Sequence, residues 1–318
     1  MIGMRRRQFV QLALTSLAAA CAPRPRGAPV RPLDADGYRT ARRFAALPFG
    51  RIAYIERGTG DAAVFLHGAP LNGFQWRGAI DRLSPRRRCI APDFMGLGYS
   101  EVPEPQSLAA DAQVAMLAAL LDALAIPRAD LVASDSGGAV AQLFVARHPE
   151  RVRSLLLTNC DVEPDSPPPK VMPAIEMARA GTLADATAAW LTDPVQARAT
   201  FGKAVYHDPA RFTDATLAYY VTPLVSSPLR RAQYHAFHVA LAPNPLAGIE
   251  AALRRSTVPV RIVWGTADDI FKVEDAEYLA ATFPKSRGIR RVPDGKLFFP
   301  EEFPDVIAEE ALRLWQAG

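Results

Sequence analysis

The chain has 318 residues, of which 49% are hydrophobic and 22% are charged, and this composition excludes a disordered or fibrous protein. It suits one large globular domain with an insertion. The net charge is +4, but five arginines lie within the first 26 residues, where no acidic residue occurs, so the charge gives no argument for nucleic-acid binding.

The N-terminal residues 1–22 have the pattern of an export signal. Arg6 and Arg7 open a segment similar to a twin-arginine motif. The apolar run that follows, residues 12–20, is too short to cross a membrane as a stable helix. We therefore predict an exported protein, periplasmic or extracellular, and keep an N-terminal tail without a targeting role as the alternative.

Two outcomes of export are consistent with this segment. An Ala-x-Ala cleavage site at residues 20–22 would release the protein from the membrane. An imperfect lipobox at residues 17–21 would instead leave a lipidated Cys21, the one membrane contact that the sequence suggests. Residues 23–44 are rich in proline and arginine and are predicted to form a linker.

The first part of the core is predicted from the polarity of its segments. Residues 51–56 alternate in polarity and predict a half-buried strand, while residues 62–66 are continuously apolar, as in a central parallel strand. Residues 72–83 predict a helix and residues 88–92 the next strand. Apolar residues at helical spacing predict a further helix over residues 107–125.

Residues 131–141 run from an apolar strand through small residues into a helix, and they predict a sharp strand-to-helix turn. A turn this tight has room only for small side chains two residues before and two residues after its apex. Ala133 and Gly137 meet this requirement around Asp135. A second frame, shifted by one residue, would put Ser136 at the apex.

Three motifs together resemble those of the α/β-hydrolase superfamily. They are HGxP at residues 67–70, DxxGxGxS at residues 93–100 and, after the turn, HPERV at residues 148–152. The resemblance covers about residues 45–318, and the superfamily's spacing from turn to HPERV favours Asp135 over Ser136 as the apex. It implies an α/β-hydrolase fold with a mostly parallel eight-stranded sheet, helices on both faces and a helical cap insertion.

The same resemblance implies roles for the HGxP loop and for the turn. The backbone N–H groups of Ala69 and Ser136 would form the oxyanion hole. His67 would brace the loop as a structural residue rather than act as a base.

The character of the sequence changes after residue 160, where four prolines precede a series of helical stretches. The resemblance places the cap at residues 161–246, between core segments 45–160 and 247–318. Its tyrosines are candidate hydrogen-bond donors to a substrate, or they only pack: Tyr206, Tyr219, Tyr220 and Tyr234. His235 and His238 lie on one helical face, but without a third ligand nearby they predict no metal site.

The second core segment carries the acid of a catalytic triad and lacks its histidine. The resemblance puts Asp268 in the position of the triad acid, with Asp161 as the alternative acid. Leu297 occupies the place of the catalytic histidine, and no histidine follows His238 in the chain. The remaining candidate bases are Lys296, His235 and His238.

These features resemble the branch of the superfamily that contains epoxide hydrolases and haloalkane dehalogenases. In that branch an aspartate, here Asp135, attacks an sp³ carbon and forms an alkyl-enzyme ester that water then hydrolyses. Ala69 and Ser136 stand where haloalkane dehalogenases usually have Asn and Trp. We therefore predict a hydrolase of a small, largely apolar epoxide or alkyl halide, with no cofactor and no nucleic-acid partner. A carboxylic-ester hydrolase that uses Ser136 and a ligand-binding pseudoenzyme are the alternatives.

Overall fold

A computed structural model describes residues 33–316, so the predicted export signal and Cys21 lie outside the described residues. Eight strands form one sheet: β1 (Arg43–Leu47), β2 (Gly50–Arg57), β3 (Ala62–Leu66), β4 (Arg88–Pro92), β5 (Ala129–Asp135), β6 (Val152–Cys160), β7 (Val260–Gly265) and β8 (Ser286–Val292). Within residues 33–316, no helix is long and apolar enough to cross a membrane.

The strand order is β1-β2-β4-β3-β5-β6-β7-β8. The pairs β1–β2 and β2–β4 are antiparallel, and every other pair is parallel. Every residue of β3 and β5 is buried, because helices cover both faces of the sheet and central parallel strands must be apolar throughout. The predicted eight-stranded, mostly parallel α/β architecture is confirmed.

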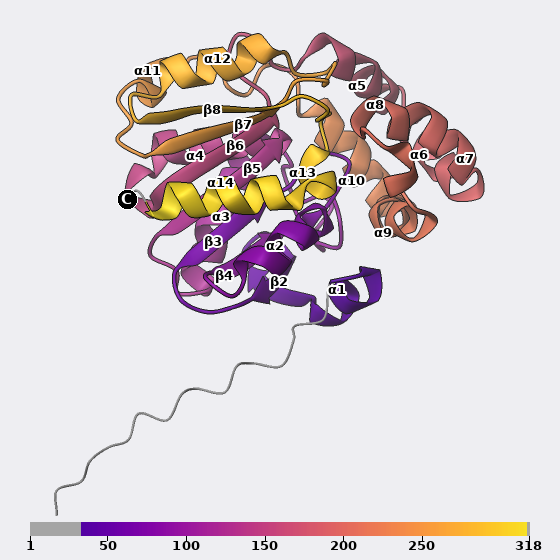
Figure 1. Ribbon diagram of the computed structural model, residues 1–318. Coiled ribbons are helices and arrows are strands. Elements are labelled where there is room, and N and C mark those ends of the chain that lie inside the picture. Colours follow the sequence, from indigo (N-terminus) through magenta and orange to yellow (C-terminus); the bar gives the residue numbers. More distant parts are fainter. Residues whose placement is uncertain (1–32, 317–318) are drawn as a thin grey trace, which may run out of the picture. The chain divides into compact units, whose positions relative to one another are not determined.

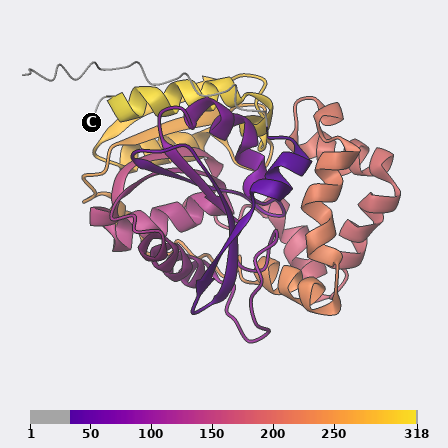
Figure 2. The same ribbon diagram turned by 90° about the horizontal axis from the view of Figure 1, so that it is seen from below.

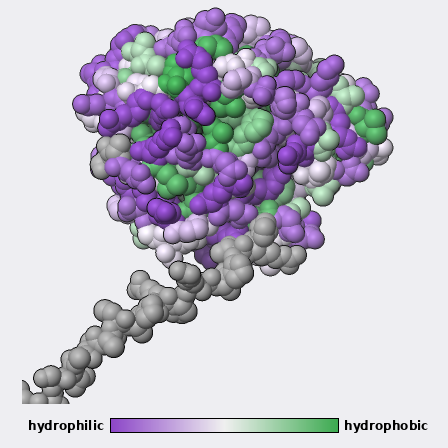
Figure 3. Space-filling view, viewed as in Figure 1, coloured by the Kyte–Doolittle hydropathy of each residue, from purple (hydrophilic) through white to green (hydrophobic). Residues whose placement is uncertain are grey.

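The helices of the core lie on the two faces of this sheet (Figure 1 and Figure 2). They are α1 (Ala35–Ala41), α2 (Arg77–Leu83), α3 (Ala110–Ala123), α4 (Ser136–Arg147), α11 (Glu250–Leu253), α12 (Val273–Thr282), α13 (Phe299–Glu302) and α14 (Pro304–Gln316). Helices α2 and α14 pack against each other, and α3 packs against α4. The face seen in Figure 3 is mostly hydrophilic, with hydrophobic residues in separate patches.

The described part of the predicted linker is partly ordered, which corrects the boundary at residue 44. Helix α1 lies within it, and β1 begins at Arg43. The Asp34 side chain caps α1 by accepting a hydrogen bond from the Gly37 N–H at 2.7 Å. The buried Tyr38 ring packs edge-on against Phe74 and Tyr219, with centroids 5.2 and 5.9 Å apart. Contacts to distant residues therefore order this helix.

The cap helices lie between β6 and β7 in the chain and group at one end of the sheet (Figure 1 and Figure 2). They are α5 (Met172–Arg179), α6 (Leu183–Thr192), α7 (Pro194–Ala197), α8 (Lys203–Val205), α9 (Asp214–Val225) and α10 (Pro228–Val239). The Arg230 guanidinium of α10 donates to the carbonyl oxygens of Gly98 and Ser100 at 2.6 and 2.8 Å. The cap is thus held directly to the DxxGxGxS turn.

The buried Glu301 side chain of the core also binds the cap. The Glu301 carboxylate pairs with Arg77 at 2.7 Å and accepts hydrogen bonds from the hydroxyls of Tyr206 and Tyr220 at 3.0 and 2.9 Å. Tyr219 instead binds the Arg42 guanidinium through its hydroxyl. Three of the four candidate tyrosines therefore bind residues of other segments through their hydroxyl groups. The prediction that these three could donate hydrogen bonds to a substrate does not match their placement.

Candidate active site

The turn between β5 and α4 has its apex at Asp135. This residue has φ 55° and ψ −135°, whereas Ser136 begins α4. Among residues 33–316, Ala125 is the only other non-glycine residue with positive φ. A Cβ atom on Gly137 would lie 2.5 Å from the His67 carbonyl oxygen, so a larger residue there would force the backbone apart. The strained backbone and the small neighbour are those of a nucleophile elbow with Asp135 at its tip.

Two backbone N–H groups donate to the Asp135 carboxylate. The Ser136 N–H lies 2.6 Å from Asp135 Oδ1, and the Ala69 N–H also donates to this carboxylate. Both belong to the predicted oxyanion hole. A Cβ atom on Gly68 would lie 2.5 Å from Asp135 Oδ2, so glycine is required for the HGxP loop to approach this closely.

His67 fixes the HGxP loop, as its predicted structural role requires. Its Nε2 accepts a hydrogen bond from the Phe94 N–H at 2.9 Å, and its Nδ1 lies 2.9 Å from the Gly68 carbonyl oxygen, to which it donates. Burial lowers the pKa of His67 to about 4, so the ring is neutral at pH 7. Both ring nitrogens are occupied by backbone groups, and neither can serve as a base.

A cavity of about 350 Å³ lies between the elbow and the cap. Its wall combines Asp135 and Ala69 from the core with Leu297 and Phe298 from the loop after β8. The cap contributes mostly apolar side chains, among them Met177, Leu183, Ala186, Trp190, Phe201, Tyr234 and His238. This size and polarity suit a small, largely apolar molecule.

Three carboxyl groups that are buried or half-buried follow one another at the ends of β5, β6 and β7. Burial raises the pKa of Asp135 well above its usual range, and the nearby Asp161 and Asp268 raise it further. Burial also raises the pKa of Asp161 and of Asp268 to about 6 each. In the described chain, no group of three His, Cys, Asp or Glu residues has the geometry to hold a metal ion.

Asp268, the predicted triad acid, has no histidine to orient. Its Oδ2 accepts a hydrogen bond from the Asn159 side chain at 2.7 Å, and its Oδ1 accepts one from the Ile270 N–H at 2.9 Å. Sequence analysis did not identify Asn159 as a partner. The sequence offered one signal for it: Asn159 lies near the end of the strand that precedes Asp161.

Leu297, which the sequence resemblance puts in the place of the histidine, lines the cavity that contains Asp135. Its side chain is 3% exposed and faces the cavity that contains Asp135. The neighbouring Lys296 does not line this cavity, because its Nζ donates to the Lys203 carbonyl oxygen at 2.5 Å. Lys296 is therefore not brought to Asp135.

The two cap histidines have different surroundings, although they share one helix. His235 lies outside the cavity, and its Nε2 accepts a hydrogen bond from the Ala184 N–H at 2.9 Å. His238 lines the cavity, with its Nδ1 donating to the Tyr234 carbonyl oxygen at 3.0 Å. Burial lowers the pKa of His238 to about 4. Of the three candidate bases, only His238 lines the same cavity as Asp135.

The Ser136 side chain lies in a different cavity from the one that Asp135 lines. Ser136 is 5% exposed, and its Oγ has no hydrogen-bond partner among the described residues. It lines a second cavity of about 20 Å³ together with Asp161. His238 does not line that second cavity, so no described histidine is placed to activate Ser136 as a nucleophile there.

Comparison with known proteins gives one family and several relatives. The model of the alpha/beta hydrolase fold family matches residues 62–303. Haloalkane dehalogenase 2 of Mycobacterium tuberculosis is 28% identical over 271 residues, which are 81% of this chain and 89% of that protein.

Two solved structures resemble the chain closely in fold. An alpha/beta hydrolase fold protein from Burkholderia ambifaria superposes with a TM-score of 0.74 and 26% identity, covering 85% of this chain and 97% of that one. The epoxide hydrolase CorEH superposes with a TM-score of 0.69 and 22% identity, covering 87% of this chain and 98% of that one, which shows a shared fold.

Proposed function

Since the chain belongs to the alpha/beta hydrolase fold family, we propose that it is a hydrolase in which Asp135 is the nucleophile. Its substrate is a small, largely apolar molecule with an electrophilic sp³ carbon. Relatives of this chain include haloalkane dehalogenases, and an epoxide hydrolase shares its fold. The reaction passes through an alkyl-enzyme ester on Asp135.

The observation that carries this proposal is the position of the Asp135 carboxylate. It lies at the apex of the elbow, accepts hydrogen bonds from the Ala69 and Ser136 N–H groups, and faces an apolar cavity. Once it has lost its proton, this carboxylate attacks an sp³ carbon without a general base. In the ester that results, the same two N–H groups are placed to stabilise negative charge on the carbonyl oxygen.

An epoxide fits the described groups better than an alkyl halide does. Ring opening leaves an alkoxide that needs a proton, and Tyr234 brings a hydroxyl to the wall of the cavity. That hydroxyl lies 3.2 Å from Thr187 Oγ1, which holds it in place. Ala69 and Ser136 supply no side-chain N–H for a departing halide. The alkyl halide remains the second substrate class because a haloalkane dehalogenase is among the relatives.

The proposal is tested by incubating the full chain with 1,2-epoxyhexane, styrene oxide and 1-bromobutane. Peptide-mapped mass spectrometry then locates any adduct, and the released diol or alcohol is measured in parallel. We expect an adduct on Asp135 that is absent from Asp135→Asn and present in Asp269→Asn, a change at an exposed carboxylate. Neither adduct nor product with any compound would contradict the proposal.

Two alternatives give different results in the same assays. A carboxylic-ester hydrolase would cleave p-nitrophenyl acetate and lose this activity in Ser136→Ala but not in Asp135→Asn. A ligand-binding pseudoenzyme would gain thermal stability with these compounds without forming adduct or product, equally in wild type and Asp135→Asn.

We also propose that the protein is exported, on the strength of the predicted signal at residues 1–22. Lipidation would leave Cys21 as the modified N-terminal residue, whereas simple cleavage would release a shorter, unmodified chain. Mass spectrometry of the mature N-terminus separates these outcomes, and an intact N-terminus on the protein from cells would contradict export.

A further inference from the structure

Hydrolysis of the alkyl-enzyme ester requires a water molecule next to Asp135 and a base to activate it. Leu297 supplies no base, and both carboxylate oxygens of Asp268 already accept hydrogen bonds from Asn159 and backbone N–H groups. Asp268 also lines neither cavity at this site. The groups for the second step must therefore come from elsewhere.

The second cavity, beside the elbow, has the dimensions of a site for one water molecule. Its volume is about 20 Å³, and about 10–15 Å³ of such space is enough to hold one water. Its polar lining includes the Ser136 hydroxyl, which is buried and has no partner among the described residues, and the Asp161 carboxylate. A buried hydroxyl left without a partner is costly, so a hydrogen-bonding molecule is favoured there.

Asp161 is close to the reacting carboxylate because of the register of the sheet. Strands β5 and β6 pair Asp135 with Cys160, and Asp161 follows at once. The Asp161 carboxylate is near enough to raise the pKa of Asp135. Its Oδ1 accepts a hydrogen bond from the Ser166 hydroxyl at 2.8 Å, which fixes its orientation.

Resting on the proposed function of Asp135, we propose that this cavity binds the hydrolytic water and that Asp161 is the base that replaces the missing histidine. Ser136 positions the water through its hydroxyl. The ligand of the new site is a single water molecule, held between the Ser136 hydroxyl and the Asp161 carboxylate.

The step balances with these groups alone. Water gives one proton to Asp161 while its oxygen bonds to the Asp135 carbonyl carbon, and the displaced electron pair rests on the carbonyl oxygen that faces the Ala69 and Ser136 N–H groups. Collapse breaks the bond to the alkyl oxygen, which takes the proton from Asp161. The alcohol leaves, and Asp135 is a carboxylic acid that carries one oxygen from water.

Asp161 suits this role better than His238 does. Burial raises the pKa of Asp161 to about 6, whereas it lowers the pKa of His238 to about 4. A general base is most effective when its pKa lies near the working pH, and Asp161 comes closer to this than His238 does. His238 lines the substrate cavity and not the small one. A water activated by His238 would have to share the space that the substrate fills.

The test follows the decay of the ester on the full chain after a pulse of 1,2-epoxyhexane, and it runs in H₂¹⁸O. We expect Asp161→Asn still to alkylate Asp135 but to hydrolyse the ester roughly 10²–10⁴-fold more slowly, the usual contribution of a general base. Ser136→Ala slows hydrolysis about tenfold, because one of two groups that hold the water is lost. In wild type, ¹⁸O enters Asp135.

The control is Asp165→Asn, a matched change of an acid in the same loop that pairs with Lys272 at 2.8 Å and lines neither cavity. Ester decay at the wild-type rate in both Asp161→Asn and Ser136→Ala would overturn the inference and leave the proposed function intact. Slower decay in His238→Gln, with Asp161→Asn unchanged, would assign the base to His238 instead. No adduct in any variant would reject the proposed function and the inference together.

Discussion

The elbow after β5 and the loop after β8 contribute to the same cavity, and they differ in what they retain. At the elbow, backbone and side chains agree: Asp135 has the left-handed conformation, and Gly68 and Gly137 leave the space it needs. In the loop after β8, the backbone returns to the cavity, but Leu297 brings an apolar side chain there. In the proposed mechanism, the first region forms the covalent intermediate, and the second offers no base to hydrolyse it.

In the proposed mechanism, the two half-reactions therefore depend on separate parts of the fold. Attack on carbon needs a carboxylate and two N–H groups, all supplied by the ends of β3 and β5 and the start of α4. Hydrolysis needs a base, and the position at which the sequence resemblance leads us to expect one is Leu297, in the loop after β8. A leucine at position 297 therefore leaves the geometry of the elbow undisturbed.

The largest effect on the elbow is expected when Asp135 is replaced. We expect Asp135→Asn to lower the rate of adduct formation by roughly 10³-fold or more, because an amide is a far weaker nucleophile than a carboxylate. Stopped-time mass spectrometry with styrene oxide measures this rate. An unchanged rate in Asp135→Asn would show that another group is alkylated.

A histidine introduced at position 297 should give the loop after β8 a base, so that this loop as well as the elbow could take part in the reaction. We expect Leu297→His to speed hydrolysis of the ester by about 10²-fold, at the lower end of what a positioned general base adds. Leu297→Gln is the matched control, since it introduces a polar side chain of similar size without a basic ring. Equal decay of the ester in Leu297→His and Leu297→Gln would mean that the loop no longer presents this position to Asp135.

The buried carboxyl group of Asp135 should also limit stability at high pH. Because burial raises its pKa, the folded state retains a proton that the unfolded state loses above pH 4, so stability falls as pH rises through the folded pKa. We expect Asp135→Asn to raise Tm at pH 8 by roughly 2–4 °C, the shift that about 1 kcal/mol produces in a domain of this size. Thermal melts at pH 4 and pH 8 provide the check, and an equal Tm difference at both pH values would argue against the ionisation of Asp135.

The smallest effect is expected where the cap meets the core, away from the chemistry. Tyr220→Phe removes one hydrogen bond to Glu301 and should lower the free energy of unfolding by about 1 kcal/mol. Adduct formation should stay at the wild-type rate, because this hydroxyl does not reach the cavity. Denaturant unfolding and the adduct assay together test this. A large loss of adduct formation with an unchanged free energy of unfolding would show that Tyr220 takes part in the chemistry.

Much of the fold could be predicted because local pattern and tertiary environment agree. Residues 62–66 are apolar throughout and form β3, and the small residues around Asp135 form the elbow. Helix α1 could not be found in this way, because it depends on Tyr38 packing against rings far along the chain. A proline-rich neighbourhood instead suggested a linker.

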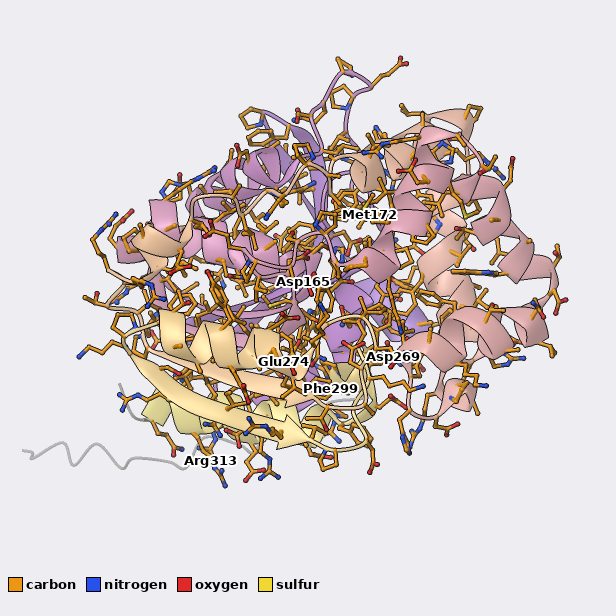
Figure 4. The ribbon with its side chains drawn as sticks, turned by 90° about the horizontal axis from the view of Figure 1, so that it is seen from above. Asp165, Met172, Asp269, Glu274, Phe299 and Arg313 are labelled. Carbon is orange, nitrogen blue, oxygen red and sulfur yellow. The ribbon has the colours of Figure 1, made fainter. Side chains whose placement is uncertain are left out.

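The site was predictable in its backbone elements and less so in its side chains. Helical spacing puts His235 and His238 on one face, but only tertiary contacts decide that one caps the start of α6 and the other faces the cavity. The contact of Tyr206 with Glu301, 95 residues away, likewise leaves no local signal. Figure 4 shows Asp269 where the core meets the cap, and its ion pair with Lys170 at 3.6 Å is another such contact.

The most direct test of the account is the fraction of Asp135 present as ester during steady turnover of 1,2-epoxyhexane. Rapid acid quenching followed by peptide mapping measures this fraction. We expect most of the protein to carry the ester, because its hydrolysis with Asp161 as the base is slower than its formation. Sustained release of diol from protein whose Asp135 remains unmodified would contradict it.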